Sequence, residues 1–126
     1  MCSTHTKEKI MIGFDLQEVA EIKDEDKLLA KIALEGEIVY IEKFKKDKKQ
    51  KVASLWAVKE AVFKALDVKA GDISFKEIEL CHKESGAPFV KLYGKAKQRF
   101  EQLNAAKIEV SISHQKTVVG AIAIIA

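Results

Sequence analysis

Hydrophobic and polar residues alternate with a period of two in five short segments of the chain, a pattern that is typical of β-strands. In the first segment, IMIGFDLQ, four apolar residues share one face: Ile10, Ile12, Phe14 and Leu16. Four later segments follow the same pattern: SFKEIELCHK, PFVKLYG, KIEVSISH and TVVGAIAIIA. The turn-like sequence ESGAP separates the first two of these, and residues 114–116 join the last two in a predicted hairpin.

Helical patterns occupy the remaining parts of the chain. Residues 23–32 predict a short helix with Asp24 as its N-cap. Residues 47–66 contain strong helix formers and neither glycine nor proline, so they predict the longest helix. KAKQRFEQLN predicts an amphipathic helix, whereas EIVYIEKF fits a strand or an irregular segment and stays undecided. This order of elements favours an α+β fold, with an antiparallel sheet packed against a long central helix, over a parallel βαβ sheet.

The composition fits one globular domain. The chain has 126 residues, of which 48% are hydrophobic and 33% charged, with one proline and no repeat or linker. We expect residues 1–9 to be a disordered extension and residues 10–126 to form the domain. The apolar run 118–126 is too short to cross a membrane, and the first residues lack the apolar core of a secretory signal, so we expect a cytoplasmic protein.

The net charge of +3 is unevenly distributed. Residues 43–51 (KFKKDKKQK) carry six lysines against one aspartate, which is +5, so the rest of the chain sums to −2. A local basic segment favours an anionic partner, although a solvated loop would look the same. Apart from Phe44 the run has no interleaved aromatic residue and no nucleic-acid-binding motif, so we do not expect nucleic acid as the partner.

The long helix carries three charges that its apolar surroundings do not explain. Lys59 falls within the large apolar stripe, and Glu60 and Lys64 lie one turn apart at the border of an alanine face. As a structural feature, Glu60 and Lys64 would form an i,i+4 ion pair of about 0.3–0.5 kcal/mol while Lys59 extended outwards. As a functional feature, the carboxylate would bind a cation and the ammonium groups would bind phosphate oxygens.

Asp15 and His114 are further candidates. Asp15 lies in mid-strand on the face opposite the apolar residues, and Gly13 beside it would let another backbone or a ligand approach closely. Asp15 and Glu60, from separate elements, could hold one Mg²⁺, although a surface aspartate at a strand end is common. His114 ends the strand VSISH, where spacing alone does not separate a structural from a catalytic role.

Together these segments resemble the holo-acyl-carrier-protein synthases of the 4′-phosphopantetheinyl transferase superfamily. The resemblance rests on IGFDLQEVAEI, WAVKEAVFKAL, ESGAPFVKLYGKA and VSISHQKTVVGAIAI, in this order, and covers residues 10–126. It implies transfer of 4′-phosphopantetheine from coenzyme A to a serine of an acidic apo-acyl carrier protein, with release of adenosine 3′,5′-bisphosphate. It also implies a homotrimer with each site at a subunit boundary.

The resemblance assigns roles residue by residue. It implies that Asp15 and Glu60 bind Mg²⁺, with Mn²⁺ as an alternative, and that these two residues and Lys64 form the catalytic group. It further implies that Lys64 contacts phosphate and that Lys59, Ser113 and His114 bind the coenzyme. Because the nucleophile belongs to the carrier protein, the enzyme needs no activated serine or cysteine of its own.

Two positions depart from the family pattern. Glu21 stands where the family usually has an arginine that contacts the carrier protein, and DVKAGD replaces a glycine-rich turn after Leu66. These departures keep open an alternative in which a catalytically weak relative binds coenzyme A or a carrier protein without transfer.

Overall fold

The computed structural model describes residues 9–69 and 71–126, so the extension predicted at residues 1–9 lies outside the described range except for residue 9. The elements along the chain are β1 (Met11–Glu18), the 3-10 turn η1 (Val19–Glu21), α1 (Glu25–Ile32), α2 (Glu35–Ile41), α3 (Lys48–Leu66), the 3-10 turn η2 (Phe75–Glu77), β2 (Ile78–His82), β3 (Pro88–Leu92), α4 (Gly94–Gln102), β4 (Ile108–His114) and β5 (Val118–Ile125). The predicted strands, the long helix and the N-cap Asp24, which accepts a hydrogen bond from the backbone N–H of Lys27, are confirmed.

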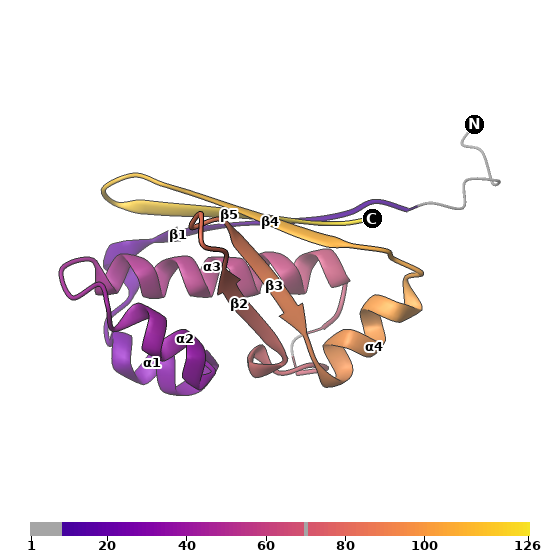
Figure 1. The fold of residues 1–126 in the computed structure, drawn as a ribbon, viewed down its shortest axis with the longest axis horizontal. Coiled ribbons are helices and arrows are strands. Elements are labelled where there is room, and N and C mark those ends of the chain that lie inside the picture. Colours follow the sequence, from indigo (N-terminus) through magenta and orange to yellow (C-terminus); the bar gives the residue numbers. More distant parts are fainter. Residues whose placement is uncertain (1–8, 70) are drawn as a thin grey trace.

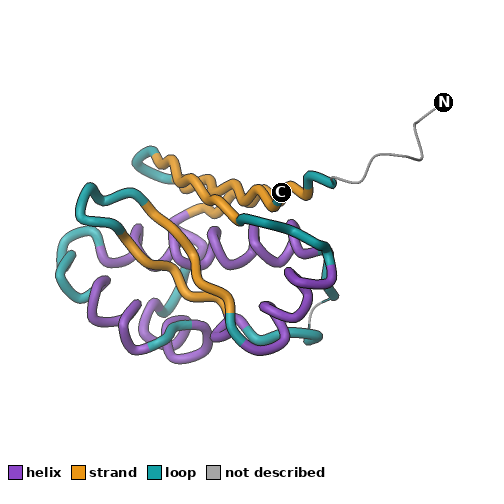
Figure 2. Tube along the Cα trace, turned by 45° about the vertical axis from the view of Figure 1, so that its right-hand side comes forward, coloured by secondary structure: helices purple, strands orange, loops and turns teal. Residues whose placement is uncertain are grey.

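The elements form two layers around α3 (Figure 1). An antiparallel sheet in the order β1-β5-β4 covers one side of α3, and α1, α2 and the antiparallel hairpin β2-β3 lie across its other side (Figure 2). The predicted α+β class is therefore confirmed, and the undecided segment EIVYIEKF contributes the helix α2. None of the described helices is long and apolar enough to cross a membrane.

The apolar face of β1 points away from α3. Ile12, Phe14 and Leu16 are 60%, 53% and 62% exposed, although an apolar strand face normally packs on the core. The reason is Gly13, where a Cβ atom would collide with the backbone carbonyl of Ala61. The glycine lets β1 lie directly on the alanine face of α3, so the side that carries Asp15 becomes the inner side.

The other side of α3 is held by a buried ion pair. Lys59 is fully buried, and its ammonium donates to Oε1 of Glu37 at 2.9 Å and to the carbonyls of Ile32 at 2.7 Å and Phe75 at 2.9 Å. The second carboxylate oxygen of Glu37 accepts the N–H of Leu80 at 2.6 Å. The structural interpretation in which Lys59 extends outwards is therefore wrong, because this network joins α1, α2, α3, η2 and β2.

Candidate active site

Asp15, Glu60 and Lys64 meet where β1 crosses α3. The ammonium of Lys64 lies 3.2 Å from Oδ1 of Asp15 and 3.0 Å from the carbonyl oxygen of Phe14. Asp15 comes from the inner face of β1, and Glu60 and Lys64 lie one turn apart on α3. The structure thus brings together the three residues that the sequence predicts as the catalytic group.

The two carboxylates of this group are incompletely compensated. The side chain of Asp15 is 14% exposed, and its Oδ2 atom is buried with no hydrogen-bond partner among the described residues. Burial raises the pKa of Glu60, the negative charge of Asp15 raises it further, and Lys64 opposes the shift. Two neighbouring carboxylates, one with an orphaned oxygen, fit a bound cation because the cation would supply the missing charge and ligand contact.

The donor set also indicates which kind of cation fits. The described residues contain no cluster of three or more histidine, cysteine, aspartate or glutamate side chains that could hold a metal ion. Two carboxylates alone suit Mg²⁺, which is usually bound by one or two carboxylates together with water and substrate phosphates. Glu60 lines a cavity of about 210 Å³ together with Lys64, Phe63 and Phe75, which leaves room for a substrate group.

His114 lies at the opposite end of α3. Its Nδ1 atom is 3.2 Å from the side-chain nitrogen of Gln50, which also approaches the carbonyl of Gln115 at 3.5 Å. From Gln50 to Glu60 the helix rises about 15 Å, at 1.5 Å per residue. Ser113 is exposed and contributes to a shallow groove on the outer face of the sheet. Within one chain, therefore, the structure does not bring His114 or Ser113 to the carboxylates.

His114 borders a second cavity of about 180 Å³, between α2, α3 and the β2-β3 hairpin. Lys51, His82 and Tyr40 also line it. The His82 ring stacks on Tyr40 with centroids 4.0 Å apart, and its pKa is lowered by burial and by the charge of Lys51. A basic rim with a stacked aromatic wall can receive the phosphate and ring of a nucleotide.

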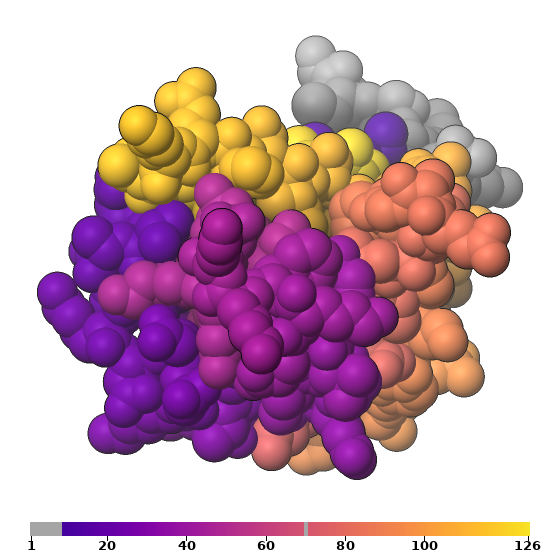
Figure 3. Space-filling model, turned by 60° about the vertical axis from the view of Figure 1, so that its left-hand side comes forward, coloured from indigo at the N-terminus to yellow at the C-terminus, as the bar shows by residue number. Residues whose placement is uncertain are grey.

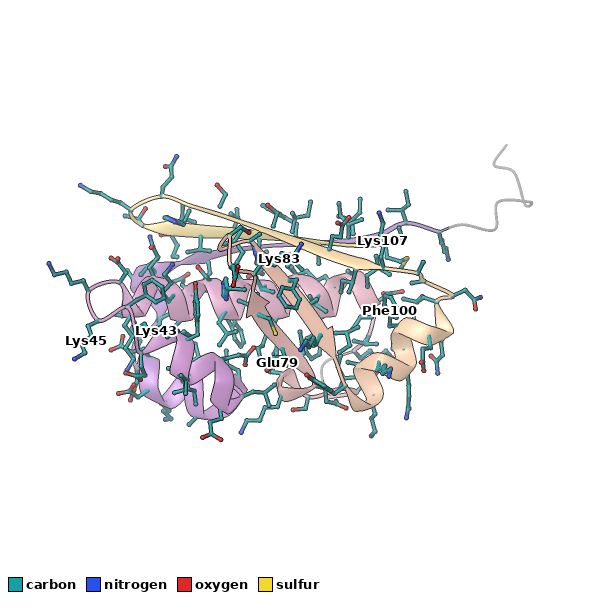
Figure 4. The ribbon with its side chains drawn as sticks, viewed as in Figure 1. Lys43, Lys45, Glu79, Lys83, Phe100 and Lys107 are labelled. Carbon is teal, nitrogen blue, oxygen red and sulfur yellow. The ribbon has the colours of Figure 1, made fainter. Side chains whose placement is uncertain are left out.

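The lysine run lies at the end of the molecule that the space-filling view brings forward (Figure 3). The segment around α2 and the start of α3 lies beside the turn between β4 and β5 (Figure 3). Lys43 and Lys45 extend from the loop between α2 and α3, and Lys83 lies on the β2-β3 turn (Figure 4). Sequence reasoning identified the lysine run but missed Gln50 and His82, because their partners lie far away along the chain.

Lys59 does not join either group. All three of its ammonium hydrogens have acceptors inside the protein, and its side chain has no exposed surface. In this conformation Lys59 has no donor left for a coenzyme phosphate.

Glu21, which departs from the family pattern, is exposed and lines a groove on the surface of α1. Lys23, Lys27 and Lys31 line the same groove. Asp24 lines it as well, so three lysines face two carboxylates and the groove keeps a small excess of positive charge.

Comparison with known proteins agrees with this arrangement. Residues 11–122 match the model of the 4′-phosphopantetheinyl transferase superfamily. The holo-[acyl-carrier-protein] synthase of Caldicellulosiruptor bescii is 40% identical over 116 residues, which cover 90% of this chain and 94% of that protein. Fatty acid synthase subunit alpha of Saccharomyces cerevisiae is 33% identical over 130 residues, which cover 98% of this chain and 7% of that protein.

The solved structures include the Helicobacter pylori holo-[acyl-carrier-protein] synthase in complex with coenzyme A. It is 30% identical, with a TM-score of 0.78, and the match covers 92% of this chain and 100% of that chain. The resemblance seen in the sequence is thereby confirmed. This chain belongs to the holo-[acyl-carrier-protein] synthase family of the 4′-phosphopantetheinyl transferase superfamily.

Proposed function

We propose that this phosphopantetheinyl transferase moves the 4′-phosphopantetheine group of coenzyme A to a serine of an apo-acyl carrier protein in a Mg²⁺-dependent reaction. Adenosine 3′,5′-bisphosphate is the leaving group. The observation that carries the proposal is the group of Asp15, Glu60 and Lys64. A buried carboxylate oxygen of Asp15 has no partner among the described residues, and Glu60 and Lys64 line a cavity. A diphosphate with its cation needs this combination of charges.

Each residue of the group has a separate task. Asp15 and Glu60 would hold Mg²⁺, which neutralises charge on the diphosphate as the bond to the leaving group breaks. Lys64 would bind a phosphate oxygen and help align the diphosphate with the incoming serine. Glu60, either directly or through a water that it helps to position, is our candidate to accept the serine proton as the serine oxygen bonds to phosphorus.

The complete site would need a second copy of the chain. Within one chain His114 contacts Gln50 near the start of α3, and Ser113 lies on the outer face of the sheet, so neither contacts the carboxylates. The outer face of β1, in turn, exposes Ile12, Phe14 and Leu16. Such a contiguous apolar face fits a subunit interface. We propose a homotrimer in which a neighbour brings its His114, its Ser113 and the cavity that its Lys51 and His82 line to the carboxylates at the subunit boundary.

The basic end of the molecule would attract the two anions of the reaction. Residues 43–51 with Lys51 at the cavity rim suit the 3′-phosphate of coenzyme A, and the exposed lysines suit an acidic carrier protein. Association should weaken as salt rises, because the attraction acts between exposed charges. A cytoplasmic location stays a prediction.

A second candidate, coenzyme or carrier binding without transfer, rests on Glu21 and on the sequence DVKAGD. An Asp15→Ala variant separates the two functions. A metal-dependent enzyme loses turnover in this variant, whereas simple binding to a carrier protein survives.

Intact-mass spectrometry of an apo-acyl carrier protein incubated with this protein, coenzyme A and Mg²⁺ tests the proposal. We expect a mass gain of one phosphopantetheine that EDTA and Glu60→Ala both abolish, and that added Mg²⁺ or Mn²⁺ restores after EDTA. No gain with several carriers, while coenzyme A still binds, would support binding without transfer.

A further inference from the structure

Lys64 occupies the carboxylate that the proposed cation needs. Its ammonium has two acceptors, both on β1: Oδ1 of Asp15 at 3.2 Å and the carbonyl of Phe14 at 3.0 Å. The Lys64 side chain is 53% exposed, whereas that of Asp15 is 14% exposed. The lysine therefore reaches inward from the solvent and covers an otherwise enclosed carboxylate.

This contact leaves the site half satisfied. With Oδ1 of Asp15 paired, its Oδ2 atom is still buried without a partner among the described residues. A divalent cation on Asp15 would lie next to the ammonium, and the two positive charges would repel each other on one carboxylate. The cation therefore binds well only after Lys64 has moved away.

The side chain of Lys64 can move from β1 into a neighbouring cavity. Its exposed side chain lines the cavity beside Glu60, and an ion pair with one exposed member contributes little stability and opens readily. The carbonyl of Phe14 is a neutral acceptor, so a diphosphate offers the ammonium a stronger anionic partner than β1 does. A diphosphate that entered the cavity would take Lys64 from β1 and leave Asp15 free for the cation.

We propose that Lys64 is a built-in counter-ion that blocks the metal site in the coenzyme-free enzyme, and that the coenzyme diphosphate opens the site by drawing Lys64 away. The inference rests on the proposed function, because it assumes that Asp15 and Glu60 bind the cation. It adds that the free protein binds the cation weakly and that cation and coenzyme strengthen each other's binding. This coupling is reciprocal by thermodynamic linkage.

The test measures Mn²⁺ binding to the full chain by electron paramagnetic resonance, without coenzyme, in 0.5 M salt to screen distant charges. Lys64→Met removes the ammonium and keeps an unbranched side chain of similar length; Lys64→Gln repeats the test with a polar residue. Lys76→Met, which removes an exposed lysine on η2, is the matched control. We expect both Lys64 variants to bind Mn²⁺ about tenfold more tightly than the wild type, and the control to bind as the wild type does.

A second arm adds coenzyme A. In the wild type it should tighten Mn²⁺ binding by more than it does in Lys64→Met, because the variant has no lysine to displace. Equal Mn²⁺ affinity of Lys64→Met and Lys76→Met without coenzyme would overturn the proposed role of Lys64. Undiminished Mn²⁺ binding by Asp15→Asn would instead overturn the metal site itself, so the two failures are distinguishable.

Discussion

Lys59 and Lys64 lie on the same helix, five positions apart, but they differ in burial and in how their ammonium groups are bonded. Lys59 is buried, and its ammonium is satisfied by Glu37 and two backbone carbonyls. Lys64 is half exposed, and the carboxylate that it contacts has one buried oxygen with no partner in the described part of the chain. The first lysine holds the helical layer together, and the second belongs to a site that still lacks a partner.

The comparison shows how buried charge can be interpreted. A buried charge whose hydrogen bonds are all made within the protein is explained by the fold, whereas an orphaned polar atom needs a ligand to explain it. By this criterion the side of α3 that faces β1 carries the candidate cation site. On the side that faces α1, α2 and β2, the buried pair of Lys59 and Glu37 is structural, although the cavity lined by Lys51 and His82 opens on this side as well.

The largest predicted effect concerns stability. Lys59→Met leaves Glu37 buried without its counter-charge, so it should lower the free energy of unfolding by about 3–5 kcal/mol in urea denaturation. Lys64→Met should lower it by less, because Lys64 is half exposed and water can reach the site that its ammonium leaves. Comparable small losses in the two variants would contradict the contrast between the two lysines.

The next effect concerns catalysis. Glu60→Gln removes a proposed metal ligand and base while keeping the shape of the side chain. Phosphopantetheine transfer should fall by about 10²–10³-fold, measured as the initial rate of mass gain of the carrier protein. Lys76→Met serves as a matched surface change, and its rate should stay near that of the wild type. Near-wild-type transfer by Glu60→Gln would remove this residue from the mechanism.

A third prediction uses the apolar face of β1. Leu16→Glu places a charge on the exposed face, so the protein should become monomeric in light scattering and lose transfer activity. With Leu16 unchanged, mixing Glu60→Ala subunits with His114→Ala subunits should restore part of the activity. Some subunit interfaces then combine an intact carboxylate group from one subunit with an intact His114 from the other. Full activity of a monomeric Leu16→Glu protein would exclude a shared site.

The smallest predicted effect is a dependence of stability on pH. The pKa of Glu60 is raised in the folded protein, so the protonated form is favoured there and ionisation of Glu60 costs stability at neutral pH. In EDTA, Glu60→Gln should therefore melt at a higher temperature than the wild type near pH 7. This difference in melting temperature should vanish as pH falls below the ordinary pKa of glutamate. A difference that persisted at such a pH would have a cause other than the ionisation of Glu60.

The pattern of the sequence predicts most of the fold because its signals are local. Alternation locates the strands, and Asp24 begins α1 as an N-cap should. The orientation of β1 is harder to predict, because its exposed face is more apolar than its buried face. Only the fit of Gly13 against the alanine face of α3 decides which side packs inward.

The candidate site also divides into residues that the sequence could predict and residues that it could not. Asp15, Glu60 and Lys64 could be grouped from the sequence because residue types and helical spacing suggest a cation and phosphate site. The environment of Lys59 could not, because Glu37 lies 22 positions away and nothing local pairs the two. The separation of His114 from Glu60 also depends on how the hairpin of β4 and β5 lies along α3.

The most direct test compares phosphopantetheine transfer by two variants of the protein. The temperature is one at which circular dichroism shows both variants to be folded. One is the double variant Lys59→Met with Glu37→Gln, which replaces the buried pair by neutral residues; the other is Glu60→Gln. We predict that the double variant is less stable than the wild type yet still transfers phosphopantetheine. Glu60→Gln should be at least as stable as the wild type and transfer almost none. A folded double variant as inactive as Glu60→Gln would show that the buried pair takes part in the reaction, either directly or through the cavity that Glu37 lines, and would contradict its purely structural role.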